Sequence, residues 1–382
     1  MSFGREKKDT PSIHIFSYPI SIAFETPLYN LYNILNEVRT YDIYLNIIKE
    51  DSIKYPRIDR IVENSMIISP QRGLVKKIGA VIRRNAFACN ILLKKLKRGD
   101  IALFFMENGA IIPCILAKIL GITTVKLLPS GIAHSGWQEM PSISSGLIYG
   151  LYVFENPWFD KIGIYGPNLI TEWNLEYIYK KILIISEHLV DTNEFNIKIE
   201  YSSRPNYIAY IGRFSLEKGI CNFLSSLPQI IAVNDEIGIW IIGDGELKDE
   251  VTSYLRRNSS YANIELLPWA EHRMLPAILN TIRLVVIPSY TEGLPNLLLE
   301  AMACGTPAIV SSVGIIPSII IDDVNGYTLE NNRPESIAYT VTKALQKKDM
   351  EVIAMKARKT IEDNFAKEVV TKKWEDLLRN LR

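Results

Sequence analysis

Short apolar runs alternate with longer amphipathic stretches along most of the chain. Short apolar runs are typical of buried strands, and an apolar position every three or four residues is typical of helices. In the N-terminal half we expect strands at residues 12–17, 41–48, 100–105, 123–128 and 181–186, helices at 27–38, 73–96 and 110–120, and an irregular stretch at 49–72. In the C-terminal half we expect strands at 207–211, 237–242, 263–267, 284–287 and 308–311, with helices at 220–233, 246–258, 273–281 and 295–304. This alternation predicts an α/β protein with parallel, doubly wound sheets.

The length of the chain and one polar segment predict two domains. The chain has 382 residues, of which 48% are hydrophobic, and this is enough for two cores of ordinary size. Residues 191–205 are polar and poor in strand signals, which favours a linker. We expect an N-terminal domain at residues 1–195, a C-terminal domain at 196–365 and a last amphipathic helix within 366–382.

Two glutamates give the strongest functional signal. Glu292 follows the apolar run that ends at Pro288, and Glu300 lies in the helix predicted to begin at Pro295. A helix that begins at the carboxyl end of a parallel strand presents its N-terminus to anionic ligands. Carboxylates beside such a site can accept hydrogen bonds from sugar or ribose hydroxyls. The alternative is that Glu292 is only a favourable charge at a helix start and Glu300 belongs to a solvated face.

A second strand followed by a glycine-containing loop carries two cations. Arg213 and Lys218 follow the predicted strand at residues 207–211 and precede a predicted helix. A guanidinium offers a planar fork for phosphate oxygens and an ammonium a mobile point charge, so the two can neutralise a diphosphate. Taken alone, they are also compatible with two ordinary surface cations.

In order and spacing, the two motifs resemble those of the group 1 retaining glycosyltransferases, which have the GT-B fold. The resemblance covers residues 207–330 well, including Gly243-Asp-Gly245, whereas the N-terminal half matches only in outline. It implies two Rossmann-like, doubly wound domains that face an interdomain cleft, with the last helix packed back on the N-terminal domain. It also implies a hexosyltransferase-type enzyme of polysaccharide or glycoconjugate biosynthesis, which transfers a sugar from a nucleotide-diphosphate sugar to a glycan or lipid-linked acceptor with retention of configuration.

The resemblance also assigns roles to residues. Arg213, Lys218 and Glu292 would be catalytic, with the two cations holding the diphosphate in place of a metal, so that no metal site and no cofactor is expected. Glu292 would contact the donor sugar, Glu300 the ribose, and the backbone near Leu267, Pro268 and Trp269 the base. The donor site as a whole would comprise Arg213, Lys218, Gly243, Leu267, Pro268, Trp269, Glu292, Gly293, Leu294, Asn296 and Glu300.

Two positions in the N-terminal half depart from the family pattern. Relatives often have a histidine just after the strand that corresponds to residues 123–128, whereas here His134 comes later and is the candidate acceptor-side residue. Ser17-Tyr-Pro-Ile20 stands where relatives often have two glycines. These departures leave open a non-catalytic partner subunit that binds nucleotide-sugar. A GT-B nucleotide-sugar epimerase is a second alternative, because the GT-B fold also hosts such enzymes.

Charge, cysteine content and hydropathy indicate which partners and which compartment to expect. The formal net charge is +1, so no strong field favours nucleic acid. The four cysteines have no metal-ligand spacing and are interpreted as buried free thiols in a reducing compartment. We found neither a signal peptide nor a membrane span, which predicts a cytoplasmic protein. The basic helical region 73–98 either contacts anionic lipid peripherally or is an ordinary solvated face. The oligomeric state is left open.

Overall fold

The computed structural model describes residues 10–18, 25–51, 54–69, 74–105, 109–128, 154–258 and 263–381. The chain divides into two compact units. Unit 1 contains residues 1–188 and 370–382, and unit 2 contains residues 189–369. In the described part of the chain, no helix is long and apolar enough to cross a membrane.

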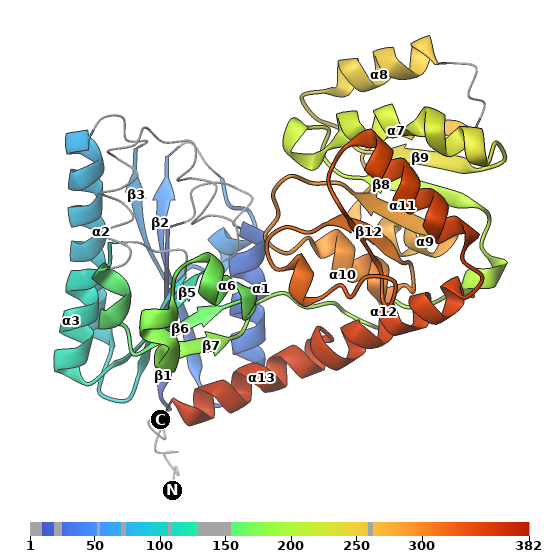
Figure 1. The fold of residues 1–382 in the computed structure, drawn as a ribbon. Helices are drawn as coiled ribbons and strands as arrows, with labels where there is room; N and C mark the ends of the chain where they lie inside the picture. Colours follow the sequence, from blue (N-terminus) through green and yellow to red (C-terminus); the bar gives the residue numbers. More distant parts are fainter. Residues whose placement is uncertain are drawn as a thin grey trace, which may run out of the picture. The chain divides into compact units, whose positions relative to one another are not determined.

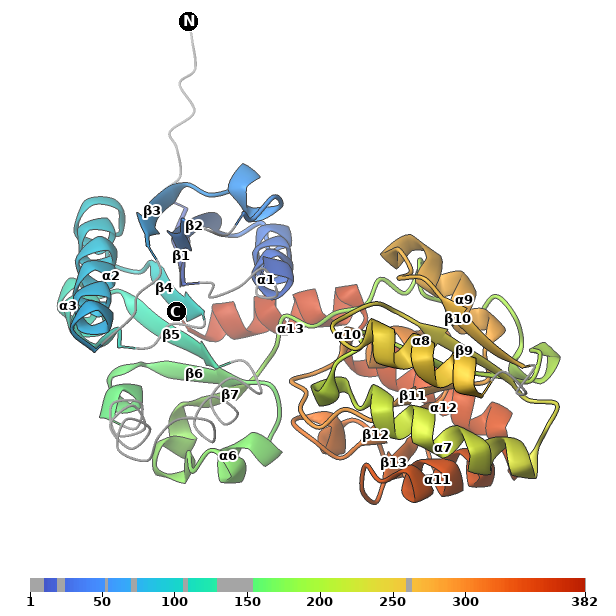
Figure 2. The same ribbon diagram turned by 90° about the horizontal axis from the view of Figure 1, so that it is seen from above.

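Unit 1 is built on a seven-stranded parallel sheet with the order β3-β2-β1-β4-β5-β6-β7. The strands are β1 (Ser12–Ser17), β2 (Asp42–Glu50), β3 (Asn64–Ile68), β4 (Ile101–Phe105), β5 (Thr123–Leu128), β6 (Lys161–Ile164) and β7 (Ile182–Ile184). The α-helices α2 (Leu74–Lys95) and α3 (Ile111–Leu120) cover one face of the sheet, and α1 (Glu25–Glu37) covers the other (Figure 1; Figure 2). Strands β1 to β3 follow one another toward one edge of the sheet, and strands β4 to β7 follow one another toward the opposite edge. The sheet is therefore doubly wound.

The last helix, α13 (Lys367–Asn380), groups with unit 1 from Val370 onward. Its Trp374 is fully buried and donates from the indole nitrogen to the Ser186 carbonyl oxygen at 3.0 Å. The Tyr41 hydroxyl donates to the Leu378 carbonyl oxygen at 3.0 Å near the end of the helix. Apolar burial and two hydrogen bonds thus attach this helix to unit 1. Unit 1 also contains the short helix α6 (Asn168–Glu172).

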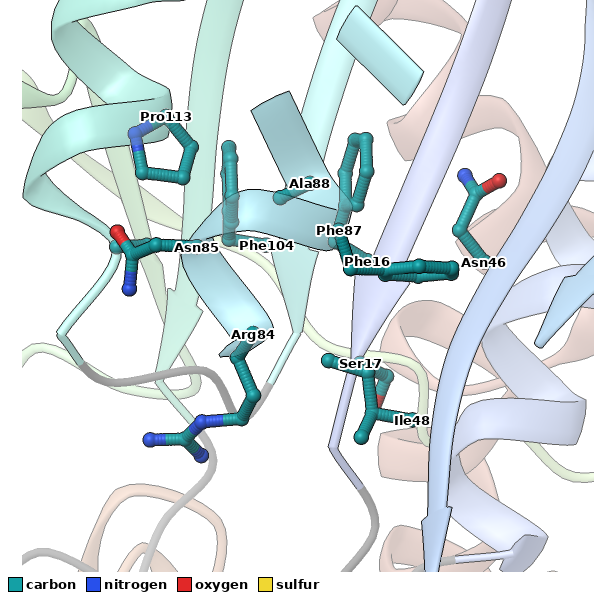
Figure 3. Close-up of a pocket in the computed structure, with 11 residues that line it drawn as sticks. Phe16, Ser17, Asn46, Ile48, Arg84, Asn85, Phe87, Ala88, Phe104 and Pro113 are labelled. Carbon is teal, nitrogen blue, oxygen red and sulfur yellow. The ribbon is translucent and has the colours of Figure 1, made fainter. Parts of the chain in front are cut away.

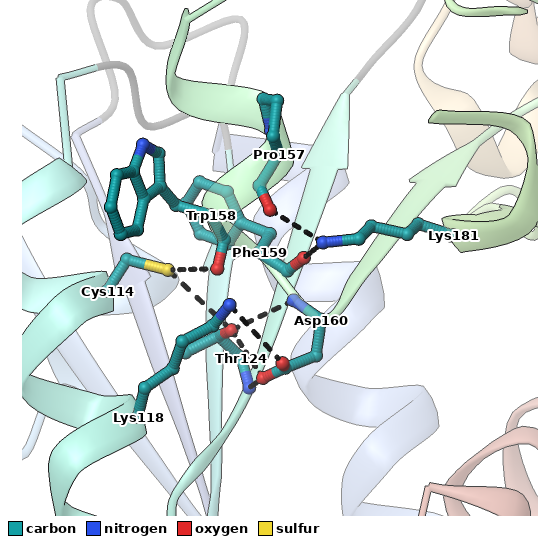
Figure 4. Close-up of polar contacts among 8 residues, drawn as sticks. All are labelled: Cys114, Lys118, Thr124, Pro157, Trp158, Phe159, Asp160 and Lys181. Carbon is teal, nitrogen blue, oxygen red and sulfur yellow. Dashed lines mark hydrogen bonds and ion pairs between the residues drawn. The ribbon is translucent and has the colours of Figure 1, made fainter. Parts of the chain in front are cut away.

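A polar cluster joins β5 to the turn before β6 (Figure 4). The Asp160 carboxylate accepts hydrogen bonds from the Thr124 amide at 2.9 Å and the Thr124 hydroxyl at 2.7 Å. Lys181 Nζ donates to two carbonyl oxygens of the same turn, at 2.6 and 2.8 Å. Burial raises the pKa of the neighbouring Cys114 thiol to about 11, so this thiol stays protonated at neutral pH. Since these groups satisfy one another, the cluster is structural.

Unit 2 is built on a six-stranded parallel sheet with the order β10-β9-β8-β11-β12-β13. The strands are β8 (Tyr207–Ile211), β9 (Gly238–Ile242), β10 (Ile264–Leu267), β11 (Leu284–Ile287), β12 (Ala308–Ser311) and β13 (Tyr327–Leu329). The helices are α7 (Ile220–Val233), α8 (Lys248–Arg257), α9 (Leu275–Thr281), α10 (Asn296–Ala303), α11 (Pro334–Gln346) and α12 (Met350–Asn364). Helices α7 and α8 lie on one face of the sheet and α9 and α10 on the other (Figure 1; Figure 2).

The predicted fold class is confirmed, with several differences in the elements. Strand β3 lies in the stretch expected to be irregular, and the sequence pattern did not predict β6, β13, α6, α11 or α12. Strand β3 pairs only with β2 at the edge of its sheet and is half exposed, so it lacks the continuous apolar run of a central strand. The segment 191–205 was expected to be a linker, but it belongs to unit 2 and contains the buried side chains of Phe195, Tyr201 and Arg204.

The four cysteines are free, but only two of them are buried. Cys114 and Cys304 are buried, whereas Cys89 and Cys221 are partly exposed. The prediction of buried thiols is therefore correct for two of the four.

Candidate functional site

The order of the strands in unit 2 locates its candidate site. Strands β8 and β11 are neighbours, while the strands that follow them in the chain, β9 and β12, lie on opposite sides of this pair. Loops that leave the carboxyl ends of two such strands separate and leave a crevice, where ligands of open α/β sheets bind. The loop after β8 carries Arg213 and Lys218, and the loop after β11 carries Glu292. The predicted cations and carboxylate therefore converge on one topological switch point.

A buried tyrosine and two glycines fix the loop after β8. The Tyr210 hydroxyl donates to the Arg213 carbonyl oxygen at 2.8 Å and lies 3.4 Å from that of Lys218. Gly219 has φ +71°, and a Cβ there would lie 2.0 Å from the Pro288 carbonyl oxygen at the end of β11. A Cβ on Gly243 would lie 2.0 Å from the Gly212 carbonyl oxygen. Side chains are excluded at both glycines because backbone strands approach each other there.

Glu292 is held by two donors. Its Oε1 accepts a hydrogen bond from Lys218 Nζ at 2.8 Å and another from Ser289 Oγ at 2.7 Å. The Lys218 side chain is 25% exposed and that of Glu292 is 10% exposed, so this ion pair is only partly screened by water. Ser289 is almost fully buried. The pair presents a cation and a carboxylate in one fixed geometry at the switch point.

The loop that contains Glu292 also touches the loop after β12. Gly314 has φ +57°, and a Cβ there would lie 2.2 Å from the Glu292 carbonyl oxygen. The Ile315 amide donates to the Gly293 carbonyl oxygen at 3.3 Å. Leu294 is buried beside it, and Asn296 is exposed at the first position of α10. Pro295 was expected inside the first turn, but it precedes the helix in an extended conformation.

Glu300 is buried in α10 and bonds to a histidine from another loop. Its side chain is 11% exposed, and its Oε1 lies 2.9 Å from His272 Nε2. His272 begins the 3₁₀ turn His272–Met274, and its ring lies against Phe195 at a centroid distance of 5.3 Å. The largely buried position rules out the solvated-face interpretation of Glu300. The carboxylate can still accept further hydrogen bonds from a ligand.

Arg213 lies apart from this ion pair. Its guanidinium pairs with Glu217 at 3.1 Å, and both side chains are about half exposed, at 57% and 45%. An exposed pair of this kind contributes little to stability. Arg213 is therefore available to a ligand at small cost, whereas Lys218 already has a partly buried partner.

The predicted base-binding residues lie at the carboxyl end of β10 and directly after it. Leu267 ends this strand, and its carbonyl oxygen accepts the Gly243 amide at 3.3 Å. Pro268 is exposed, and the Trp269 side chain is 60% exposed. An exposed indole next to backbone polar groups is suited to stack against a planar ring.

Sequence reasoning missed three supporting residues. Ser289 and His272 hold the two glutamates, and Asn332 donates from its side chain to the carbonyl oxygens of Pro288 and Ser289 at 3.2 and 3.1 Å. Only Ser289 had a signal, because it lies within the motif of Glu292. His272 and Asn332 come close to the site only through the folding of unit 2.

Unit 1 has a pocket at the switch point between β1 and β4, drawn in Figure 3. Phe16 and Phe104 lie at its wall, and its polar residues are Ser17, Asn46, Arg84 and Asn85. The buried Ser17 Oγ and Asn85 Oδ1 have no hydrogen-bond partner among the described residues. Ser17 lines this pocket, and it is the first residue of the segment that stands where relatives often have two glycines. His134, the predicted acceptor-side residue, lies outside the described residues.

Across the described ranges, no group of three or more histidine, cysteine, aspartate or glutamate residues is placed to hold a metal ion.

Comparisons with known proteins show what unit 2 is similar to in sequence. Residues 191–364 match the family described as glycosyl transferases group 1. An uncharacterized glycosyltransferase of Methanocaldococcus jannaschii is 30% identical over 195 residues, which are 46% of this chain and 50% of that protein. The capsular polysaccharide biosynthesis glycosyltransferase CapM of Staphylococcus aureus is 24% identical over 194 residues, 49% of each chain. The chain thus matches about half the length of these relatives.

Solved structures match nearly the whole chain. HepE of Anabaena, solved in complex with UDP, matches with a TM-score of 0.73 at 14% identity. The match covers 97% of this chain and 100% of the HepE chain. The lipopolysaccharide outer core galactosyltransferase WaaB has a TM-score of 0.68 at 16% identity, with 97% and 99% covered. The fold is GT-B, and residues 191–364 are similar to the glycosyl transferases group 1 family.

Proposed function

We propose that this protein transfers a hexosyl group from a nucleotide-diphosphate sugar to a glycan or lipid-linked acceptor, with retention of anomeric configuration and without a metal. The observation that carries the proposal is the Lys218–Glu292 ion pair, partly buried at the switch point of unit 2. The match of residues 191–364 to the glycosyl transferases group 1 family supports it, as do the names of the relatives.

The cations act on the leaving group. When the bond between the anomeric carbon and the phosphate oxygen breaks, the diphosphate takes the electron pair and negative charge develops on it. Lys218 stabilises this charge from a fixed, partly desolvated position, and Arg213 can leave Glu217 to contact the same phosphates. The acceptor oxygen forms the new bond on the same face of the sugar, and its proton passes to the leaving phosphate oxygen.

The glutamates act on different parts of the donor. Glu292 lies in the loop beside Lys218 and accepts a hydrogen bond from a hydroxyl of the transferred sugar. Glu300 lies within α10 beside His272 and accepts hydrogen bonds from the ribose. Trp269 and the backbone at Leu267 and Pro268 border the base. His134 is proposed for the acceptor side, on the basis of the sequence alone.

The two glutamate-to-glutamine variants test this function and the division of roles. A nucleotide sugar found by screening a panel is expected to stabilise the wild type by about 2.7 kcal/mol at a hundred times its dissociation constant. Glu300→Gln is expected to weaken binding of both the free nucleotide and the nucleotide sugar by at least about ten-fold, because a charged hydrogen bond contributes about 1.5–3 kcal/mol. Glu292→Gln is expected to lower turnover mainly, with nearly unchanged affinity for the free nucleotide.

Glu335→Gln provides the control, since Glu335 is an exposed glutamate in the first turn of α11. Its nucleotide affinity, measured by titration calorimetry, and its turnover, measured by steady-state kinetics, should equal those of the wild type. Equal losses of nucleotide affinity in Glu292→Gln and Glu300→Gln would show that the division is wrong. If no nucleotide sugar stabilises the protein, the proposed function itself is wrong. Donor turnover without any acceptor would favour an epimerase.

Turnover is expected to persist in excess EDTA. The physical reason is that Arg213 and Lys218 supply the positive charge that a divalent metal supplies in other sites. The measurement is initial rate after exhaustive chelation, compared with the rate after addition of magnesium or manganese. Loss of turnover that either metal restores would contradict the role given to the two cations.

A further inference from the structure

The outer face of unit 1 carries an apolar stripe that no other described element covers. In α2, Ile78, Ile82 and Leu93 are exposed by 52%, 63% and 63%. In α3, Ile112 and Ile119 are exposed by 64% and 77%. Residues spaced by four, seven or eleven positions lie on one side of a helix, so each set forms a stripe. We call these five residues the apolar stripe.

The two helices form one continuous layer. They pack against each other and lie side by side on the same face of the sheet in both views (Figure 1; Figure 2). In α2, Ile91 and Leu92 are buried, and in α3, Cys114 and Ala117 are buried. Since these buried positions face the sheet, the apolar stripe points away from it.

The charged residues of the two helices themselves have a single sign, and one of them, Lys118 of α3, pairs with Asp160 at 3.8 Å. Helix α2 contains six lysine or arginine residues and no acidic residue, and α3 contains one lysine and no acidic residue. Arg83 and Lys94 are exposed and lie on one side of α2, next to Ile82 and Leu93. Neither forms an ion pair with a residue that the structure describes. The net charge of the whole chain is only +1, so this basic layer is local.

We propose that the outer face of α2 and α3 binds the surface of an anionic phospholipid bilayer. An amphipathic helix with apolar side chains beside lysine and arginine lies in the membrane interface, where it combines apolar burial with attraction to anionic headgroups. A second copy of the chain fits this face poorly. A two-fold symmetric contact would place the same basic residues of both copies against each other, and like charges repel. The inference does not depend on the proposed transferase activity.

Sedimentation with vesicles tests the proposal on the full chain. The protein is expected to sediment with vesicles that contain phosphatidylglycerol and at least about ten-fold less with pure phosphatidylcholine, because each basic residue near an anionic surface contributes about a factor of five. Raising the salt concentration should release it. Arg83→Glu combined with Lys94→Glu should lower the partition coefficient by at least about ten-fold. Ile78→Ser combined with Ile82→Ser should lower it as well, with the nucleotide-sugar affinity unchanged.

A charge-matched control is available on unit 2. Arg256→Glu combined with Arg257→Glu changes two exposed arginines at the end of α8 and should leave vesicle binding unchanged. Equal binding to neutral and anionic vesicles, or no binding to either, would overturn the proposal. So would light scattering that shows a dimer which Ile78→Ser and Ile82→Ser dissociate, because a second copy would then occupy the face. Vesicle binding is measured without a donor, so its outcome is separate from that of the proposed function.

Discussion

Lys218→Ala is expected to lower the turnover of sugar transfer by about a hundred-fold or more, the scale for removing one preorganised stabiliser of transition-state charge. Lys218 Nζ is held 2.8 Å from Glu292 Oε1, and its side chain is only 25% exposed. A cation in this position needs little reorganisation when charge develops on the leaving phosphate, and water screens it less than an exposed cation. The measurement is kcat with a nucleotide sugar that the wild type binds.

Two further variants separate this effect from a loss of structure. Lys248→Ala removes an exposed lysine whose Nζ lies 2.8 Å from Asp244 in the same unit, and its turnover should equal that of the wild type. Lys218→Arg keeps the charge with a different geometry and should give an intermediate rate. Urea unfolding of each variant shows whether the protein is folded under the conditions of the assay. Wild-type turnover in a folded Lys218→Ala protein would remove the residue from the mechanism.

Arg204→Ala is expected to lower the free energy of unfolding of unit 2 by about 3–5 kcal/mol, which is the scale for leaving buried partners of a charge unsatisfied. Arg204 is 2% exposed. Its guanidinium donates to the carbonyl oxygens of Ile199, Leu279, Ile282 and Cys304 at 2.7–3.3 Å and to the Thr306 hydroxyl at 2.7 Å. The variant would leave these acceptors buried without their donor.

Two further variants test whether the loss of stability comes from the buried guanidinium: a lysine at position 204 and an alanine at an exposed arginine. Arg204→Lys keeps a charge but cannot reproduce the planar fork of donors, so it should lose most of the same stability. Arg257→Ala, at an exposed position of α8, should change the free energy of unfolding by less than about 0.5 kcal/mol. Urea unfolding with linear extrapolation measures all three. If Arg204→Ala unfolds at the wild-type urea midpoint, the guanidinium network contributes nothing to stability.

The central strands were predictable because burial on both faces leaves a continuous apolar run in the sequence. Five expected strands, β1, β5, β8, β11 and β12, have the observed bounds. Each has neighbours on both sides in its sheet. Edge strands β3 and β13 lack this signal, because β3 is half exposed and β13 has three residues. Periodicity therefore identified the central strands except β6, and among the edge strands it found β7 and β10 but missed β3 and β13.

The linker prediction differed from the structure for a related reason. Residues 191–205 look polar, yet Arg204 is buried among carbonyl oxygens and Tyr201 lies in the core of unit 2. A buried guanidinium has the same sequence signature as a surface guanidinium. Only the contacts made by segments far along the chain show which of the two it is.

The sequence by itself determined the α/β class and the strand, loop and helix around each motif, and it supplied the candidate residues for nucleotide-sugar binding. Local patterns determine these features because secondary structure follows from spacing and turn chemistry within about ten to twenty residues. Only the tertiary structure decided that Lys218 pairs with Glu292 while Arg213 does not, and that His272 bonds to Glu300. These contacts depend on the strand order of unit 2, which places β8 beside β11 although they are far apart in sequence. The order of strands in a sheet is set by the packing of the whole unit, so no local pattern contains it.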